Sequence, residues 1–289
     1  MSVKTSTEID SAARLVGEER AVEYIAKAGF DAWDFSMFSM CCYDWHTKTF
    51  SQSDHPLAGS NYLKFARQLK RIGTDNGIIC NQSHAPFPSR FPEISDWLKR
   101  AIECTAEAGG DICIIHPDNN ETPEKNAEMY FELLPFAKSC GVKIATENMF
   151  NWNGERDEPS FAACCNPQSF CAHLEAVNDD SFVACLDIGH AEMKPIGTSA
   201  VEMIHALSDK LFALHIHDND LLHDLHEIPF SGGVNFREVV AALKEIGYNG
   251  YFTLEADSYL NRYTKENVRD GIAELYKSAR RLVDMFESK

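Results

Sequence analysis

The feature of this sequence that most constrains its fold is an eightfold alternation of a short β-rich segment and a longer segment with apolar residues at helical spacing. The expected strands cover residues 3–6, 30–36, 77–82, 112–116, 142–147, 182–187, 211–217 and 250–255. The expected helices cover 12–28, 62–72, 95–108, 123–140, 167–177, 199–207, 236–246 and 265–286. Few polar residues interrupt the strands, as expected when both faces of a parallel sheet are buried. The alternation predicts a single (β/α)8 TIM barrel that forms one domain over residues 1–289.

Length and charge narrow the function. At roughly 150 residues per domain, 289 residues allow two domains, but α/β barrels reach this length as one. No G-x-G-x-x-G motif follows an expected strand, which disfavours a dinucleotide-binding fold. The net charge of −17 disfavours nucleic acid as a partner, because binding to a phosphate backbone depends on Lys and Arg.

The compartment is predicted from the N-terminus and the cysteines. The first residues contain no apolar signal region, and no run of about 18 apolar residues predicts a membrane span. The ten cysteines include the adjacent pairs 41–42 and 164–165 and no C-x-x-C motif. Adjacent cysteines bridge poorly and zinc-ribbon spacing is missing, so we expect mostly buried free thiols in a reducing cytoplasm.

Polar residues stand at the ends of six consecutive expected strands, where the active sites of such barrels lie. These residues, with those of the following loops, are His84, His116, Glu147, Asp187, His190, His217, Asp224, His226 and Glu255. Carboxylates that converge on one barrel mouth repel one another unless a cation is present. Mixed carboxylate and imidazole ligands suit one divalent ion, of which Mn²⁺ or Zn²⁺ is favoured over Co²⁺ or Mg²⁺.

Other histidines and tryptophans are weaker candidates. His215 also faces the barrel interior, but one layer deeper, and we interpret it as a core residue or a support for the ligands. The remaining histidines of loops and helices are expected at the surface: His46, His55, His173 and His205. Three tryptophans, Trp33, Trp45 and Trp152, fit an apolar wall against a sugar face and core packing equally well.

Over about residues 3 to 283, the sequence resembles the xylose isomerase-like TIM-barrel superfamily, which includes sugar isomerases, ketose 3-epimerases, hydroxypyruvate isomerase and endonuclease IV. The motifs that carry the resemblance are Glu147-Asn148, Leu186-Asp-Ile-Gly-His190, His215-x-His217-x-x-Asp220, Asp224-x-His226, Gly232-Gly-Val-Asn-Phe236 and Leu254-Glu255. The resemblance implies a divalent metal held by Glu147, Asp187, His217 and Glu255. It further implies that Glu147 and Glu255 transfer the proton. It also implies that His190 contacts the substrate. The other strand-end and loop residues that we expect to bind substrate are His84, His116, Asp224 and His226.

The expected function is therefore a metal-dependent sugar isomerase or epimerase that acts through an enediolate stabilised by the metal. The sequence departs from the ketose 3-epimerases at two positions. His223 stands where that branch has a substrate-binding Arg, and Asn153 replaces a second Glu, although Glu155 lies nearby. The loop 151–166 is also longer than in that branch, and such a loop is where substrate choice would be determined.

Three alternatives remain open. All nine strand-end residues also fit the trinuclear zinc site of endonuclease IV, which predicts a phosphodiesterase acting on abasic DNA. The second alternative is a barrel that binds a sugar or a metal without turnover, or that acts as a subunit of a larger enzyme. The third alternative is a lyase that acts on modified glycosides through the same enolisation. The expected partner is a small sugar without nucleic acid or membrane, and a homo-oligomer is compatible with the sequence.

Overall fold

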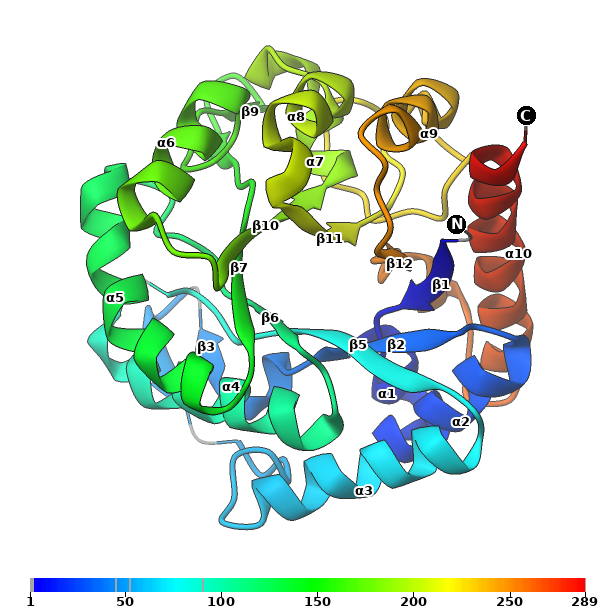
Figure 1. Ribbon diagram of the computed structural model, residues 1–289. Helices are drawn as coiled ribbons and strands as arrows, with labels where there is room; N and C mark the ends of the chain where they lie inside the picture. The colour runs from blue at the N-terminus through cyan, green and yellow to red at the C-terminus, as the bar shows by residue number, and fades with distance from the viewer. Residues whose placement is uncertain (1–2, 45, 52, 90, 289) are drawn as a thin grey trace.

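The computed structural model describes residues 3–44, 46–51, 53–89 and 91–288, and it confirms the TIM barrel. Eight parallel strands form the inner ring, surrounded by helices (Figure 1). In chain order these strands are β1 (Lys4–Thr7), β2 (Ala32–Ser36), β5 (Ile79–His84), β6 (Ile112–Ile114), β7 (Lys143–Glu147), β10 (Phe182–Asp187), β11 (Leu211–His215) and β12 (Tyr251–Leu254). Each of these strands starts within two residues of the start predicted from the sequence.

Parallel pairing closes the ring. Six strands follow the order β11-β10-β7-β6-β5-β2, and β1 pairs with β12 as a second sheet. Single parallel bridges join the two sheets, one between Glu8 and Asp34 and the other between Ile216 and Leu254. All strands therefore end at the same rim of the barrel, which places their C-terminal side chains around one mouth.

Helices surround the ring (Figure 1). They are α1 (Asp10–Val16), α2 (Glu18–Ala28), α3 (Tyr62–Asp75), α4 (Ser95–Ala108), α5 (Pro123–Ser139), α6 (Pro167–Val177), α7 (Ile188–Glu192), α8 (Ala200–Leu207), α9 (Phe236–Glu245) and α10 (Val268–Glu287). The short helix α7 lies inside α8, next to β10 and β11. The predicted helix 12–28 is divided at Gly17, whose φ of +81° interrupts helical geometry. Gly29 ends α2 in the left-handed conformation, as predicted from its position.

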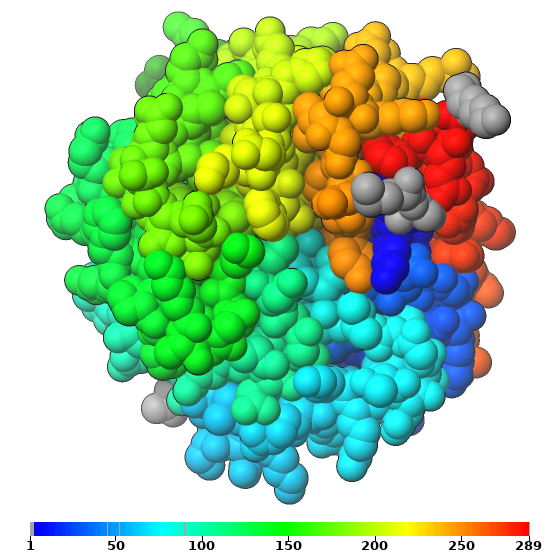
Figure 2. All heavy atoms as spheres, viewed as in Figure 1, coloured from blue at the N-terminus to red at the C-terminus, as the bar shows by residue number. Residues whose placement is uncertain are grey.

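The core fills the space between the strands and the helices, and side chains close the gaps that the ribbons leave open (Figure 2). Trp33 is fully buried in this core, so of its two predicted roles the structure supports packing. Trp45 lies outside the described residues. Inside the barrel, strand residues such as Ser6, Asn81 and Thr253 are polar, buried and hydrogen-bonded to one another.

Two short hairpins were not expected. β3 (Cys42–Asp44) pairs with β4 (Thr49–Ser51), and β8 (Asn151–Asn153) pairs with β9 (Glu158–Ser160), both antiparallel. The second hairpin is the structure adopted by part of the long loop 151–166. Among the described residues, no helix is both long and apolar enough to cross a membrane. All ten cysteines are free and seven of them are buried, as predicted.

Candidate metal centre at the barrel mouth

The predicted strand-end residues meet at one pocket. Seven of the nine line it: His84, His116, Glu147, His190, Asp224, His226 and Glu255. The other two, Asp187 and His217, are fully buried and contact residues of the lining. Side chains from six strands and their following loops therefore converge at the mouth, as the strand ends predicted.

Glu147 and Glu255, at the ends of β7 and β12, approach the same imidazole. The Nδ1 of His215 donates to Oε1 of Glu147 at 2.8 Å and lies 3.3 Å from Oε2 of Glu255. On the opposite side of its ring, the Nε2 of His215 donates to Oδ2 of Asp34 at 3.2 Å. His215 is therefore a fully buried support that links both glutamates to β2, in line with its predicted position one layer deeper.

Histidines surround Glu147. The Nε2 of His116 donates to its Oε2 at 3.1 Å, and the Nε2 of His84 lies 3.5 Å from the same oxygen. Burial alone would raise the pKa of Glu147, but the charge of His215 and the hydrogen bonds from the histidines hold it well below the usual range. Burial, aided by the neighbouring His84, lowers the pKa of His116 to about 4.

Glu255 has the opposite electrostatic environment. Burial raises its pKa to about 7, and the negative charge of Glu147 adds to this effect, although His215 opposes it. The two glutamates thus differ in their readiness to carry a proton, because hydrogen bonds from His116 and His215 stabilise the charge of Glu147, whereas burial and the charge of Glu147 dominate at Glu255.

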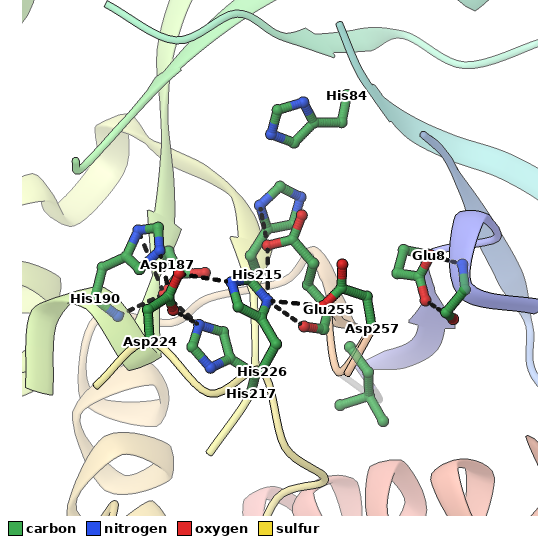
Figure 3. A network of polar contacts seen from close by, with 12 residues as sticks. Glu8, His84, Asp187, His190, His215, His217, Asp224, His226, Glu255 and Asp257 are labelled. Atoms are coloured by element: carbon green, nitrogen blue, oxygen red, sulfur yellow. Dashed lines mark hydrogen bonds and ion pairs between the residues drawn. The ribbon is translucent and has the colours of Figure 1, made fainter. Parts of the chain in front are cut away.

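Asp187 is at the centre of a second cluster (Figure 3). Its Oδ1 accepts from the backbone N–H of His190 at 2.6 Å, which caps α7, and lies 3.1 Å from Nε2 of His217. Gly189 makes this approach feasible, because a Cβ on that residue would lie 2.0 Å from Cε1 of His217. The Gly of the Leu-Asp-Ile-Gly-His motif is therefore required by the position of His217.

Asp224 joins the same cluster from the loop after β11. Its Oδ2 accepts from Nε2 of His226 at 3.1 Å, and its Oδ1 lies 3.4 Å from Nε2 of His190. Burial disfavours a charge on His190, yet Asp187 and Asp224 raise its pKa to about 10. The Nδ1 atoms of His190 and His226 donate to the backbone carbonyls of Asn148 and Glu255, at 2.9 and 2.8 Å, and this fixes both rings.

The polar atoms that face one another here fit a cation. Within the part of the chain that the structure describes, four of them are buried without a hydrogen-bond partner: Oδ2 of Asp187, Nε2 of His190, Nε2 of His217 and Oδ1 of Asp224. Unpaired buried polar groups are rare, and a carboxylate and imidazole donor set suits a divalent transition metal.

The ligand atoms fall into overlapping groups. One contains Glu147, Asp187, His215 and Glu255, whose atoms lie within 4.8 Å of one another. His217, predicted as the fourth ligand beside the three carboxylates, is instead grouped with His190, Asp224 and His226. His84, His116 and Glu147 form a third group.

Sequence reasoning missed or misplaced several residues. Asp34 was not singled out, although a charged residue inside the buried strand Ala-Trp-Asp-Phe-Ser is itself a signal. His173, expected at the surface, is buried, because its ring contacts the amide of Asn126 and the backbone carbonyl of Ser169. That prediction was wrong, since the helical face on which His173 lies packs against α5.

The long loop borders the pocket. Asn151 lines it, and its side chain donates to the side-chain oxygen of Asn120 and to the backbone carbonyl of Phe161, both at 2.9 Å. Trp152 is 42% exposed, and its ring lies 5.5 Å from that of His223. His223, where ketose 3-epimerases have an Arg, is half exposed and bonded to Asp220, so it reaches this rim rather than the glutamates.

The fold and the site together define a TIM barrel with imidazole and carboxylate side chains at the C-terminal mouth. The model of the family described as xylose isomerase-like TIM barrel matches residues 22–281. The chain belongs to this family.

The individual relatives are only distantly similar to this chain in sequence. An uncharacterised protein of Methanocaldococcus jannaschii is 25% identical over 270 residues, which cover 87% of this chain and 80% of that protein. Fructoselysine 3-epimerase of Shigella flexneri is 26% identical over 179 residues, or 58% of this chain and 61% of that enzyme. The crystal structure of a D-tagatose 3-epimerase-like protein superposes with a TM-score of 0.69 at 21% identity, covering 97% of this chain and 98% of the other.

Proposed function

We propose that this chain is a divalent-metal-dependent sugar isomerase or epimerase in which Glu147 and Glu255 transfer the proton. Membership of the family, the similarity to fructoselysine 3-epimerase and the shared fold with a D-tagatose 3-epimerase-like protein support this class. The observation that carries the proposal is the convergence of two carboxylates from separate strands on one imidazole nitrogen, at 2.8 and 3.3 Å, in the wall of one pocket.

The proposed ligands of one metal are Glu147, Asp187, His217 and Glu255. A bound Mn²⁺ or Zn²⁺ would supply positive charge beside the substrate oxygen that becomes negative when the neighbouring carbon loses its proton. The position of Asp187 supports its assignment, since its Oδ2 is buried without a hydrogen-bond partner in the described chain.

The protein groups then account for the proton movement. One glutamate removes the proton from the carbon beside the carbonyl, and the other returns a proton to the opposite face or to the neighbouring carbon. Return to the opposite face gives epimerisation, and return to the neighbouring carbon gives aldose–ketose isomerisation. His215 keeps both carboxylates oriented, while His84, His116, His190, Asp224 and His226 line the pocket where sugar hydroxyls would bind.

Solvent exchange tests this function. The protein loaded with Mn²⁺ is incubated in D₂O with a panel of free ketoses and 3-keto sugars, and deuterium on carbon is followed by NMR. We expect incorporation beside the carbonyl, and its loss in Glu147→Gln and Glu255→Gln. Glu245→Gln is the matched control, because Glu245 is an exposed partner of His205 on the outer helices. Absence of exchange on every sugar of the panel would contradict the proposal.

A second candidate is a phosphodiesterase that uses several metals, as in endonuclease IV. The observation that favours it is that the potential ligands at the mouth fall into several groups, of which the group His190, His217, Asp224 and His226 shares no residue with the groups around Glu147. The net charge of −17 opposes it, because a DNA-binding surface needs Lys and Arg. Elemental analysis separates the two functions: one metal per chain supports sugar chemistry, whereas three metals with nicking of abasic DNA support the nuclease.

The remaining alternatives are separated by the same assays. A sugar-binding subunit would bind sugars without exchange, and a lyase would eliminate the substituent after exchange. We also infer that residues 1–289 form one domain, since one hydrophobic cluster extends from Val3 to Phe286. The ten free cysteines support a reducing, cytoplasmic environment.

A further inference from the structure

The pocket at the barrel mouth is larger than a simple sugar requires. Its volume is about 560 Å³. A water molecule takes about 30 Å³ in the liquid, so a six-carbon sugar with about twelve non-hydrogen atoms fills less than about 360 Å³, since bonded atoms lie closer together than separate waters. Space therefore remains for a second group attached to the sugar.

The charge of the lining disfavours a phosphate as that group, because the four histidines of the lining already contact the carboxylates of Glu147 or Asp224. Six carboxylates line the pocket: Asp10, Asp118, Glu147, Asp224, Glu255 and Asp257. Arg14 is the one Lys or Arg among the described lining residues, and it is already paired. Its guanidinium lies 3.0 Å from Oδ2 of Asp10 and 3.4 Å from Oδ2 of Asp257.

Three backbone N–H groups near the mouth are also occupied. TIM barrels often hold phosphate on the loops after the seventh and eighth strands. Here the N–H groups of Gly232 and Val234, in the loop after β11, donate to the carboxylate of Asp218 at 2.8 and 3.1 Å. At the start of α1, the N–H of Ser11 donates to Glu8 at 3.0 Å. Each of these positions carries one of the protein's own carboxylates where a phosphate would bind.

The other part of the lining is apolar. The rings of Phe38 and Phe87 lie 5.3 Å apart, and both are half-buried against the pocket. Phe87 stacks on His116 at 5.1 Å, and Phe38 contacts the ring of His84 at 4.7 Å. Through these two histidines, the aromatic pair Phe38–Phe87 borders Glu147. An apolar group on a sugar bound at the glutamates would thus reach these aromatic rings.

We propose that the substrate is an uncharged keto-sugar that carries an apolar O-linked substituent, as in a glycoside, and that Phe38 and Phe87 bind this substituent. This inference rests on the proposed function, because it places the sugar at Glu147 and Glu255. It excludes sugar phosphates as substrates, and it distinguishes this pocket from one built for an unsubstituted ketose.

Equilibrium binding tests the substrate class without requiring turnover. The Mn²⁺-loaded protein is titrated by calorimetry with phenyl β-D-glucoside, methyl β-D-glucoside and D-glucose 6-phosphate. We expect the phenyl glucoside to bind at least about tenfold more tightly than the methyl glucoside, because of the added aromatic contact. We expect the phosphate ester to bind more weakly than both.

Substitutions in the pocket test which residues bind the apolar substituent and which affect phosphate binding. Phe87→Ala should reduce the preference for phenyl over methyl glucoside to less than about threefold with little change in methyl glucoside affinity. Asp10→Asn combined with Asp257→Asn removes both carboxylates paired with Arg14 and should strengthen phosphate ester binding severalfold. Arg14→Met should leave the weak phosphate affinity unchanged. Arg90 lies outside the described residues, so Arg90→Met is tested beside it.

Several results would overturn the inference: equal or tighter binding of the phosphate ester, loss of that binding in either arginine variant, or no advantage of phenyl over methyl glucoside. The failure of the proposed function is distinguishable. In that case the phenyl glucoside binds as expected, but neither its 3-keto form nor any other keto-sugar exchanges deuterium in the presence of Mn²⁺.

Discussion

Two polar layers inside the barrel differ in how their hydrogen-bonding groups are used. In the middle layer, formed by Ser6, Asn81, Gln82 and Thr253, every side chain is bonded to another member. In the mouth layer, Asp187, His190, His217 and Asp224 each keep one buried polar atom without a hydrogen-bond partner in the described chain. Asp187, His190 and His217 are buried like the residues of the middle layer, so burial alone does not mark the site.

This difference in hydrogen bonding distinguishes residues that stabilise the fold from residues that bind a ligand. A satisfied buried network contributes to stability and to a unique arrangement of strands. Unsatisfied groups cost stability, and they persist where a ligand completes them. We therefore expect substitutions in the middle layer to change stability, and substitutions in the mouth layer to change metal binding and catalysis.

The largest expected effect is on proton transfer. Glu147→Gln and Glu255→Gln should each lower the deuterium exchange rate by about 10²–10⁴-fold, the usual contribution of a general base. The melting temperature of Glu255→Gln should stay near that of the wild type, because the raised pKa of Glu255 already favours its neutral form. That of Glu147→Gln should fall, because the histidines that stabilise the charge of Glu147 lose their partner. Asn81→Ala, in the middle layer, should instead lower the melting temperature and leave the exchange rate unchanged. If Asn81→Ala abolished exchange in protein that stayed folded, the distinction between the layers would fail.

Glu8 tests whether a buried carboxylate that lies near other acidic groups, outside the glutamate site, lowers the stability of the fold. It is buried beside Asp257 and Asp10, and burial, followed by these charges, raises its pKa to about 8. Below pH 4.5, the unfolded pKa, Glu8 is protonated in both the folded and the unfolded protein, and its contribution to stability is complete. As the pH rises from 4.5 towards 8, the unfolded protein loses this proton first, so the free energy of unfolding falls. In Figure 3 Glu8 lies apart from the histidine cluster.

Glu8→Gln should therefore be more stable than the wild type above pH 8 by a few kcal/mol, at about 1.4 kcal/mol per pKa unit. The advantage should shrink between pH 8 and 4.5. Urea unfolding of both proteins at several pH values measures the difference. A difference that does not vary with pH would show that Glu8 has an ordinary pKa.

The body of the barrel could be predicted because its signals are local. Apolar spacing located the strands and helices, and glycines such as Gly29 and Gly109 ended helices where expected, both with positive φ. The hairpins at 42–51 and 151–160 were missed because their three-residue strands are too short to show a period. His215 was placed at the right depth, but its contacts with Asp34 and Glu147 join residues 181 and 68 positions apart.

Gly189 tests the packing that orients the mouth layer. In Gly189→Ala the new Cβ would overlap the ring of His217, so the imidazole must move away from Asp187. We expect about a 10–100-fold loss of metal affinity, comparable to that caused by losing a support of a metal ligand. Competition with a chromogenic chelator measures it. Gly154→Ala is the control, since a Cβ there meets nothing within 4 Å. Unchanged affinity in Gly189→Ala would remove His217 from the ligand set.

The smallest expected effect belongs to the middle layer. The hydroxyl of Ser6 donates to Oδ1 of Asn81 at 2.6 Å, and both residues are buried. Ser6→Ala removes this donor and leaves the amide oxygen unsatisfied, which should cost about 1–3 kcal/mol of unfolding free energy. Metal affinity and the exchange rate should not change, because Ser6 contacts the middle layer alone among the polar groups described. A fall in metal affinity as large as that of Gly189→Ala would mean that the two layers act as one network, and that the unpartnered atoms at the mouth depend on the strands beneath them.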